Sequence, residues 1–533
     1  MRGAVAVGAV LSALFLAVAS MAPARGAEPG PTVLRATFAS FPDYLDPQLS
    51  YTAEGWTAMY DTYIPLLTYR HASGKAGSEV IPGLAQSLPM ISDGGRKYVL
   101  YLRQGLRYSN GRPVRASDFK YTVRRMFEMY SGGSSFFADV EHIATDDETG
   151  RIAIRLTRPR GTFTYELALP FVALVPRGTP MRDQSAHPPP ATGPYAITES
   201  RIGEGWSYER NPEWDLHNGA LLPQLPGGHV DEIRVMVMRN PLAQVRAVED
   251  GAVDWMQNPP PPSLTAGIKH RYGGSQFRLD PTLSLYYFWM NTAKTPFDDV
   301  RVRRAVNYAI DPKVLQAIYG GQVVPAHQIL PPGMPGYRSL DLYPHDMAEA
   351  RRLIAKAKPR DRKITVWADN ESPNEEATAY YAQVLRGLGF KARLKVLSAD
   401  NYFTAIGNLS TPNLDTGWSN WFEDYPHPND FFQPLLSGES IFRRYNSNFT
   451  QIDVPPLNRR ITGLRERQRI SESGYAALDR SYMKLAPMAP YGTRVLSTFV
   501  SSRVALDKVI WSSTFGADLA SFQFKYSGWT AVD

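Results

Sequence analysis

Short apolar runs alternate with amphipathic stretches along most of the chain. The runs have the length and the β-branched and aromatic content of strands, and they occupy residues 97–102, 151–156, 233–238 and 283–290. The amphipathic stretches at 118–130 and 299–310 carry apolar residues at helical spacing. This interleaving of strands and helices predicts an α/β fold.

Capping side chains mark the starts of several predicted helices. Ser117 precedes the first of these stretches, and Asp299 leads the residues VRVRRAVNYAI. Asp311-Pro312 has an N-cap followed by a proline in the first turn. Asp346 with Glu349 fits a capping box before ARRLIAKA.

One segment reads as a strand–loop–helix–strand unit. Its expected parts are a strand at 363–367, a polar loop at 368–374, a helix at 375–388 and a strand at 391–396. Ligands bind sheets of this kind at the carboxyl ends of strands. Asp369 and Asn370 are therefore candidate binding residues, and a solvated loop is the alternative.

The first 26 residues have the pattern of a secretory signal peptide. Arg2 is followed by an apolar run at 5–19, no charge appears from residue 3 to 24, and small residues offer a cleavage site. A retained anchor is the alternative, but the apolar run is shorter than the ~20 residues that a spanning helix needs. The pattern predicts an exported protein.

Composition narrows the class of protein. The 533 residues are 43% hydrophobic and 20% charged, which is typical of globular proteins and leaves room for two or three domains. The proline runs at 187–190 and 258–262 predict extended connections or surface loops. The absence of cysteine excludes disulfides, thiolate metal sites and a lipoprotein anchor.

The net charge of +7 predicts mild attraction to acidic surfaces. The densest basic run, at 458–469, has apolar residues at helical spacing, so it is interpreted as a solvated helix face. No nucleic-acid partner is expected.

Motifs for catalysis and for metal binding are missing from the sequence. The chain has no His-Glu-x-x-His, Gly-x-Ser-x-Gly or phosphate-binding glycine loop, and its nine histidines do not cluster. No cofactor, metal site or catalytic residue is predicted, although acids distant in sequence can still meet in a glycosidase.

The segment at 418–432, WSNWFEDYPHPNDFF, mixes carboxylates with aromatic rings. Either the acids point to water above packed rings, or the segment lines a pocket where a cation meets aromatic walls. The second arrangement is physically sound, because a buried cation needs a charge partner and aromatic faces add to the attraction.

Several short motifs follow one another along the chain in an order and at spacings that are characteristic in combination. They are Leu45-Asp46-Pro47, IPGLA at 81–85, TGPY at 192–195, RNP at 210–212 and PFDDVRVRRAVNYAID at 296–311. With these motifs the mature chain resembles, over almost its whole length, the family 5 extracellular solute-binding proteins of ABC importers, the dipeptide-, oligopeptide- and nickel-binding group.

The resemblance implies two α/β lobes with mixed sheets and an extra subdomain inserted in the first lobe. The expected division is lobe I at 31–67, 191–282 and 503–533, the inserted subdomain at 68–190, and lobe II at 283–502. Ligand is expected between the lobes, enclosed when they close about a hinge.

The resemblance also implies binding residues. In peptide-binding members a tryptophan followed three residues later by aspartate lines the cleft, and the aspartate pairs with the ligand ammonium; Trp421 and Asp424 match. Glu423 stands where small residues are usual and adds a negative charge. The further candidates are Trp418, Tyr425, Tyr44 and Tyr51.

The implied function is capture of a short peptide or similar cationic solute, and its delivery to an ABC permease driven by a separate ATPase. The expected protein is a monomer without enzymatic activity in the periplasm or cell envelope. An oligosaccharide or nickel-chelate binder of the same family, and a secreted hydrolase, remain alternatives.

Overall fold

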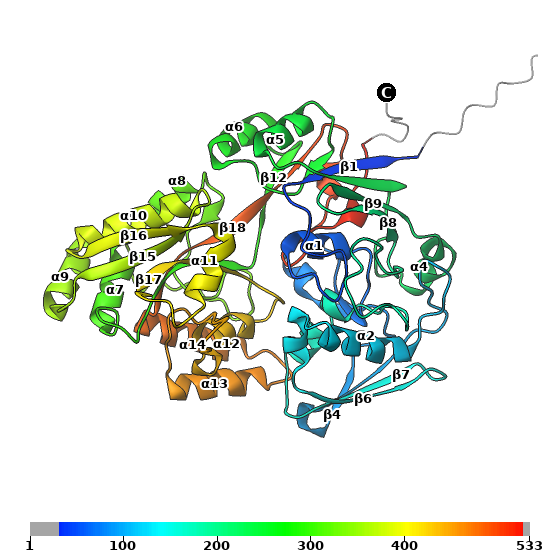
Figure 1. Ribbon diagram of the computed structural model, residues 1–533, viewed down its shortest axis with the longest axis horizontal. Helices are drawn as coiled ribbons and strands as arrows, with labels where there is room; N and C mark the ends of the chain where they lie inside the picture. Colours follow the sequence, from blue (N-terminus) through cyan, green and yellow to red (C-terminus); the bar gives the residue numbers. More distant parts are fainter. Residues whose placement is uncertain (1–30, 526–533) are drawn as a thin grey trace, which may run out of the picture.

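A computed structural model describes residues 31–525, so the predicted signal peptide lies outside the described residues. The chain forms two lobes joined along one side (Figure 1). We call the part built on β1, β8–β11 and the inserted sheet the first lobe, and the part built on β13 and β15–β17 the second lobe. The predicted residue boundaries between the lobes stay a prediction.

A single twelve-stranded sheet runs through both lobes. Its order is β16-β15-β17-β13-β18-β11-β1-β10-β9-β8, and β12 and β14 also pair with β18. The strands are β1 (Val33–Phe38), β8 (Tyr195–Arg201), β9 (Gly205–Arg210), β10 (Glu232–Val237), β11 (Trp255–Met256), β12 (Phe277–Pro281), β13 (Ser284–Met290), β14 (Val323–Val324), β15 (Lys363–Asp369), β16 (Lys391–Leu397), β17 (Thr416–Phe422) and β18 (Met488–Val500).

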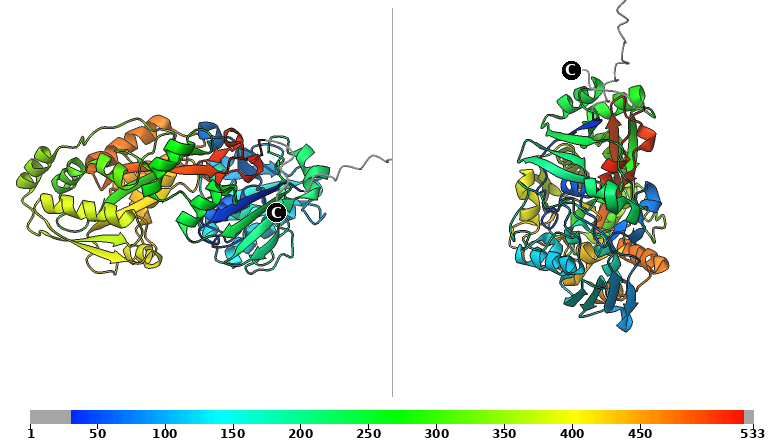
Figure 2. Two further views of the ribbon diagram at one scale, coloured as in Figure 1. Left: turned by 90° about the horizontal axis from the view of Figure 1, so that it is seen from above. Right: turned by 90° about the vertical axis from the view of Figure 1, so that its right-hand side faces the viewer.

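The strand β18 joins the two lobes. Its first part pairs with β13, and its last part pairs with β11 and β12. The left-hand view of Figure 2 shows this red-orange strand passing from one lobe into the other. The short segment between β12 and β13 crosses beside it, where Thr282 N–H donates to the Arg494 carbonyl. Two adjacent crossing segments therefore connect the lobes.

The second lobe has the architecture predicted from its sequence pattern. The strands β15 and β16 are parallel and are linked by a helix at 374–387. All seven residues of β13 are buried, as expected for an apolar strand in the middle of a sheet. Its helices are α7 (Val300–Ala309), α8 (Pro312–Ile318), α9 (Met347–Ala357), α10 (Asn374–Gly387), α11 (Ala399–Ile406), α12 (Asn429–Leu436), α13 (Pro455–Arg465) and α14 (Glu472–Leu485).

The predicted helix caps are largely confirmed. The side chains of Asp299, Asp311 and Asp346 accept hydrogen bonds from the first backbone N–H groups of α7, α8 and α9. The capping box at α9 is incomplete, because the Glu349 carboxylate binds Arg352 instead. The cap predicted at Ser117 is wrong, because α2 (Ala116–Glu128) begins one residue earlier and Arg115 occupies the N-cap position.

The first lobe carries the remaining elements. Its other helices and strands are α1 (Ala53–Met59), α3 (Phe163–Glu166), α4 (Gly219–Leu221), α5 (Pro241–Glu249), α6 (Pro262–Tyr272), β2 (Leu67–Tyr69), β3 (Val80–Pro82), β4 (Met90–Ser92), β5 (Lys97–Tyr101), β6 (Val140–Asp146), β7 (Arg151–Leu156), β19 (Trp511–Ser512) and β20 (Gly516–Ala517). The strands β4-β5-β7-β6 form a separate sheet that packs with α2 below α1 in Figure 1. The C-terminal segment at 504–522 shares a core with β1. The fold is thus mixed α/β, two-lobed, with an extra subdomain.

No helix in the described part of the chain combines the length and apolarity that crossing a bilayer requires.

A buried ion pair fixes the turn of the Leu45-Asp46-Pro47 motif. Asp46 accepts two hydrogen bonds from the Arg125 guanidinium of α2, at 2.6 and 2.5 Å, and both side chains are fully buried. Asp46 also accepts the Gln48 N–H, which caps the turn. The pair ties the segment before α1 to the inserted subdomain.

We predict that Asp46→Asn lowers the free energy of unfolding by about 3–5 kcal/mol, because it leaves the Arg125 charge buried and unpaired. Urea denaturation measures the change. The control is Glu232→Gln, which breaks the exposed pair with Arg234 and should cost less than about 1 kcal/mol. Equal effects of the two substitutions would contradict the prediction.

Candidate functional site

Two cavities lie between the lobes and meet at one pair of residues. Each cavity measures about 360 Å³, and Tyr51 and Asp424 line both. The Tyr51 hydroxyl, from the first lobe, donates to the Asp424 carboxylate of the second lobe at 2.8 Å. This hydrogen bond crosses the cleft and divides it into the first cavity and the second cavity.

The first lobe holds Tyr51 in place through Asp43. The Asp43 carboxylate accepts the Tyr51 N–H and the hydroxyls of Ser50 and Thr52. The Thr52 side chain then caps α1. A single carboxylate therefore shapes the loop that carries Tyr51 and the start of the helix behind it.

On the second lobe, the segment after β17 is folded by Asp430. The Asp430 carboxylate accepts the Asp424 N–H at 2.8 Å and the Trp421 indole N–H at 3.2 Å. Tyr425 reaches across the cleft and packs in the core of the inserted subdomain beside Phe136 and Tyr165. The segment thus closes against the first lobe, and Asp424 is left facing the cleft.

Three carboxyl groups in this segment have no basic partner within ion-pair distance among residues 31–525, namely Glu423, Asp424 and Asp430. Burial raises the pKa of Asp424 to about 7, although the Tyr51 hydrogen bond opposes the shift. Burial and the neighbouring Asp424 raise the pKa of Asp430, and burial raises that of Glu423. The site accumulates acidic groups that a cation would stabilise in the charged form.

The first cavity is lined from both lobes and from the C-terminal segment. Its walls include Trp56, Trp255, Asn258, Tyr286, Glu423, Arg494, Trp511 and Phe515. Sequence reasoning missed most of these, because they come from distant segments. Arg494 alone offered a signal, since a single arginine interrupts the otherwise uncharged run of β18.

The second cavity has a mixed lining. Trp421, Tyr425, Asp430, Arg160 and Arg465 contribute to it. Arg160 pairs with Glu166 and Asp139, whereas Arg465 is buried without such a pair among the described residues. Its rim includes the exposed rings of Phe442 and Tyr445.

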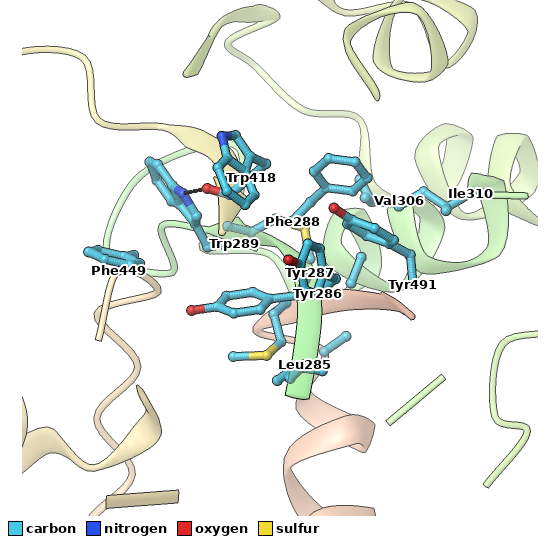
Figure 3. Close-up of a cluster of buried hydrophobic side chains, with 14 of the residues drawn as sticks. Leu285, Tyr286, Tyr287, Phe288, Trp289, Val306, Ile310, Trp418, Phe449 and Tyr491 are labelled. Carbon is cyan, nitrogen blue, oxygen red and sulfur yellow. Dashed lines mark hydrogen bonds between the residues drawn. The ribbon is translucent and has the colours of Figure 1, made fainter. Parts of the chain in front are cut away.

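The structure brings five of the predicted binding residues to the cavities and leaves four outside. Those that line a cavity are Asp424, Trp421, Tyr425, Glu423 and Tyr51. Trp418 does not, because it lies in the core of the second lobe (Figure 3). It is 2% exposed and stacks on Tyr402. Its carbonyl accepts the Trp289 indole N–H, as the figure shows.

The other three residues have local roles. Asp369 accepts the Glu371 N–H and the Asn374 side-chain amide, which shapes the loop before α10. Asn370 accepts the Ala399 N–H, and Tyr44 is exposed. The polar loop at the end of β15 is thus used for turn geometry rather than for lining either cavity.

Histidine contributes to one buried cluster outside the cavities. His71 Nδ1 lies 2.7 Å from Asp518 and 3.7 Å from Asp61, and the three are the group whose spacing could hold a metal ion in the described chain. The contacts form a hydrogen-bonded network that ties the C-terminal segment to Asp61, which follows α1, and to His71, which follows β2. His427, near the acids, is packed between aromatic rings, and its Nδ1 accepts the Asn429 N–H.

The two lobes, the crossing strand and the enclosed cleft define a solute-binding fold. A structure named Clavulanic acid biosynthesis oligopeptide binding protein 2 is similar with a TM-score of 0.83 and 25% identity, covering 92% of this chain and 95% of that one. A peptide-bound periplasmic binding protein from Helicobacter pylori has a TM-score of 0.75 at 19% identity, with coverage of 93% and 99%.

Sequence comparison identifies the family. The profile of the bacterial extracellular solute-binding proteins, family 5 Middle, matches residues 79–442, and the chain belongs to this family. It is 24% identical to Heme-binding protein A of Haemophilus influenzae over 83% of this chain and 84% of that protein. It is equally identical to the Dipeptide-binding protein of Escherichia coli, over 74% and 77%.

The family assignment settles the broad class of activity. Solute-binding proteins are non-enzymatic components of ABC transport. The secreted hydrolase, an alternative from sequence, is therefore wrong.

We predict that Tyr51→Phe raises the pKa of Asp424 above its value of about 7, because the substitution removes a hydrogen bond that favours the carboxylate. A carbon-13 NMR titration of labelled aspartate carboxyls measures the shift, and Asp424→Asn identifies the resonance. An unchanged or lower pKa would show that the bond does not form in solution.

Proposed function

We propose that this protein captures short peptides, or similar cationic solutes, in the cleft between its lobes and delivers them to an ABC permease. Energy for transport would come from a separate ATPase. The observation that supports the proposal is the Asp424 carboxylate, which faces both cavities, has no basic partner among the described residues and stands among aromatic side chains.

A ligand ammonium suits this place for electrostatic reasons. The raised pKa of Asp424 means that its charged form lacks stabilisation in the ligand-free cleft. An ammonium beside it would supply the missing charge, and the rings of Trp421, Tyr425 and Tyr51 would add cation–π attraction. The names of several relatives, which include dipeptide- and glutathione-binding proteins, agree with a peptide-like solute.

The oligosaccharide alternative has less support. The first cavity does contain Trp56, Trp255 and Trp511, but Glu423, Asp424 and Arg494 beside them, unpaired within the described chain, favour a charged solute over a neutral sugar. Of the two tryptophans at 418 and 421, Trp418 is enclosed by Tyr402 and Tyr286 and lines neither cavity. Trp421 is the only one of the two that a sugar ring could reach from the second cavity.

The place of action follows from the same proposal. Relatives are named as periplasmic proteins, and we propose that this chain is exported and acts in the periplasm or cell envelope, as a monomer.

We predict that Asp424→Asn weakens binding of dipeptides at least tenfold, since a hydrogen bond to a charged group contributes about 1.5–3 kcal/mol. Isothermal calorimetry with a dipeptide panel measures the affinities. The matched control is Asp369→Asn, another buried aspartate of the second lobe that lines neither cavity. If Asp424→Asn bound dipeptides as tightly as the wild-type protein, the proposed contact between Asp424 and the peptide ammonium would be refuted.

The affinity for a cationic ligand should also depend on pH. Asp424 binds a proton below its pKa of about 7, and an ammonium must displace that proton, so affinity should rise between pH 5 and pH 7. Calorimetry in buffers of different ionisation enthalpy would detect the released proton. The increase in affinity from pH 5 to pH 7 should be smaller in Asp424→Asn. An identical increase would mean that other groups cause the pH dependence.

A further inference from the structure

A buried arginine without an acidic partner lies on the strand that joins the lobes. Arg494 of β18 lines the first cavity and is 9% exposed. No carboxylate of residues 31–525 lies within ion-pair distance of its guanidinium, and its Nη1 has no hydrogen-bond partner there. A buried guanidinium with free N–H groups is costly unless something else neutralises it.

The surroundings hold this guanidinium in a fixed orientation. Its Nη2 donates to the Gln322 side-chain carbonyl at 2.7 Å. Gln322 is itself fixed, because its amide donates to Thr265 and to the Pro260 carbonyl. The ring of Tyr319 lies 5.5 Å from the guanidinium carbon. Neutral groups therefore position the charge without cancelling it.

An acidic side chain in the same cavity lacks a basic partner. Glu423 is 4% exposed and lines the first cavity. One of its oxygens accepts only the Thr514 hydroxyl, at 3.2 Å, and the other has no partner. No basic side chain in the described chain pairs with it. The cavity thus contains one uncompensated cation and one uncompensated acid, with Asp424 beside the acid.

We propose that the first cavity selects a compact zwitterion, with Arg494 binding the carboxylate of the solute and Glu423 joining Asp424 around its cationic end. This inference rests on the proposed capture of a solute in the cleft, and it adds the anionic group and the residue that binds it. Free peptides and other amino-acid derivatives have this charge pattern, whereas sugars do not.

The sheet sets the spacing of the two charges. Glu423 follows β17 and Arg494 lies on β18, and these strands flank β13 on its two sides. Their backbones are therefore about two strand spacings, ~10 Å, apart, and both side chains line the first cavity. An extended peptide spans at most ~3.5 Å per residue, so the two ends of a dipeptide fit this distance with the side chains reaching inward.

The test compares dipeptides built from alanine, phenylalanine, lysine and aspartate with their C-terminal amides. For wild-type protein we expect the amides to bind roughly ten- to a hundredfold more weakly than the acids, the loss typical of a charged hydrogen bond. In Arg494→Met the acid and the amide should bind alike, and Arg494→Lys should keep part of the preference. The matched control, Arg303→Met, changes a buried arginine of α7 that also lacks an acidic partner among residues 31–525 but lines neither cavity, and it should keep the full preference.

A second measurement addresses the cationic end and the solute itself. Glu423→Gln should weaken binding of the free dipeptides while leaving the acid-to-amide ratio unchanged. Native mass spectrometry of freshly purified protein would identify any solute carried through purification. We expect that solute to carry both an amine and a carboxylate.

The outcomes separate this inference from the proposed function. If dipeptides bind but acids and amides bind wild-type protein equally, the role of Arg494 is rejected and peptide capture stands. If no dipeptide binds but the co-purified solute is another zwitterion whose affinity depends on Arg494, peptide capture is rejected and the inference stands. If neither a dipeptide nor a zwitterionic solute binds, both are rejected.

Discussion

The candidate site is defined by ionisable groups that are enclosed in the cleft without opposite charges beside them. Glu423, Asp424 and Asp430 lie together on the second lobe, and Arg494 lies on the crossing strand, yet none of these four makes an ion pair within residues 31–525. Other buried charged groups of the described chain also lack an opposite charge, among them Arg303, Asp369 and Asp479, but these bond to backbone or amide groups and line neither cavity. The cleft groups differ because they border a space where a solute could supply the missing charge.

The architecture explains how such a site is assembled. The acids come from the end of β17, Tyr51 comes from the loop before α1, and Arg494 comes from β18, which belongs to the sheet of both lobes. Residues more than 350 positions apart meet in one hydrogen bond between Tyr51 and Asp424. A carboxylate fixes each of the loops that bring these residues together, Asp43 in the first lobe and Asp430 in the second lobe. Each carboxylate accepts more than one hydrogen bond from nearby N–H or O–H groups.

Sequence pattern was sufficient for much of the fold and for part of the site. The strands, the parallel unit at 363–397 and the caps at Asp299, Asp311 and Asp346 follow from local periodicity and capping chemistry, which act over a few residues. Trp421 and Asp424 were predicted as binding residues because they match a short motif of the family that the chain resembles, and both line a cavity.

The remaining site residues were beyond such reasoning. Arg494 and Trp255 join the cavity only through long-range pairing of strands, and Thr514 joins it because the C-terminal segment packs against the first lobe. Trp418 looked like Trp421 in sequence, but the alternation of a strand points successive residues to opposite faces, and packing against Tyr402 decided which face is core.

The continuity of β18 has a consequence for the order of events in capture. If the lobes open about the crossing segments, Arg494 would keep nearly the same surroundings, because a residue near the pivot moves least, while Asp424 and Tyr51 would separate. An arriving solute would first dock its anionic end on this stationary anchor. The segment that carries Asp424 would then close onto the cationic end of the solute. Initial binding and closure would therefore depend on different residues, Arg494 for the first and Asp424 for the second.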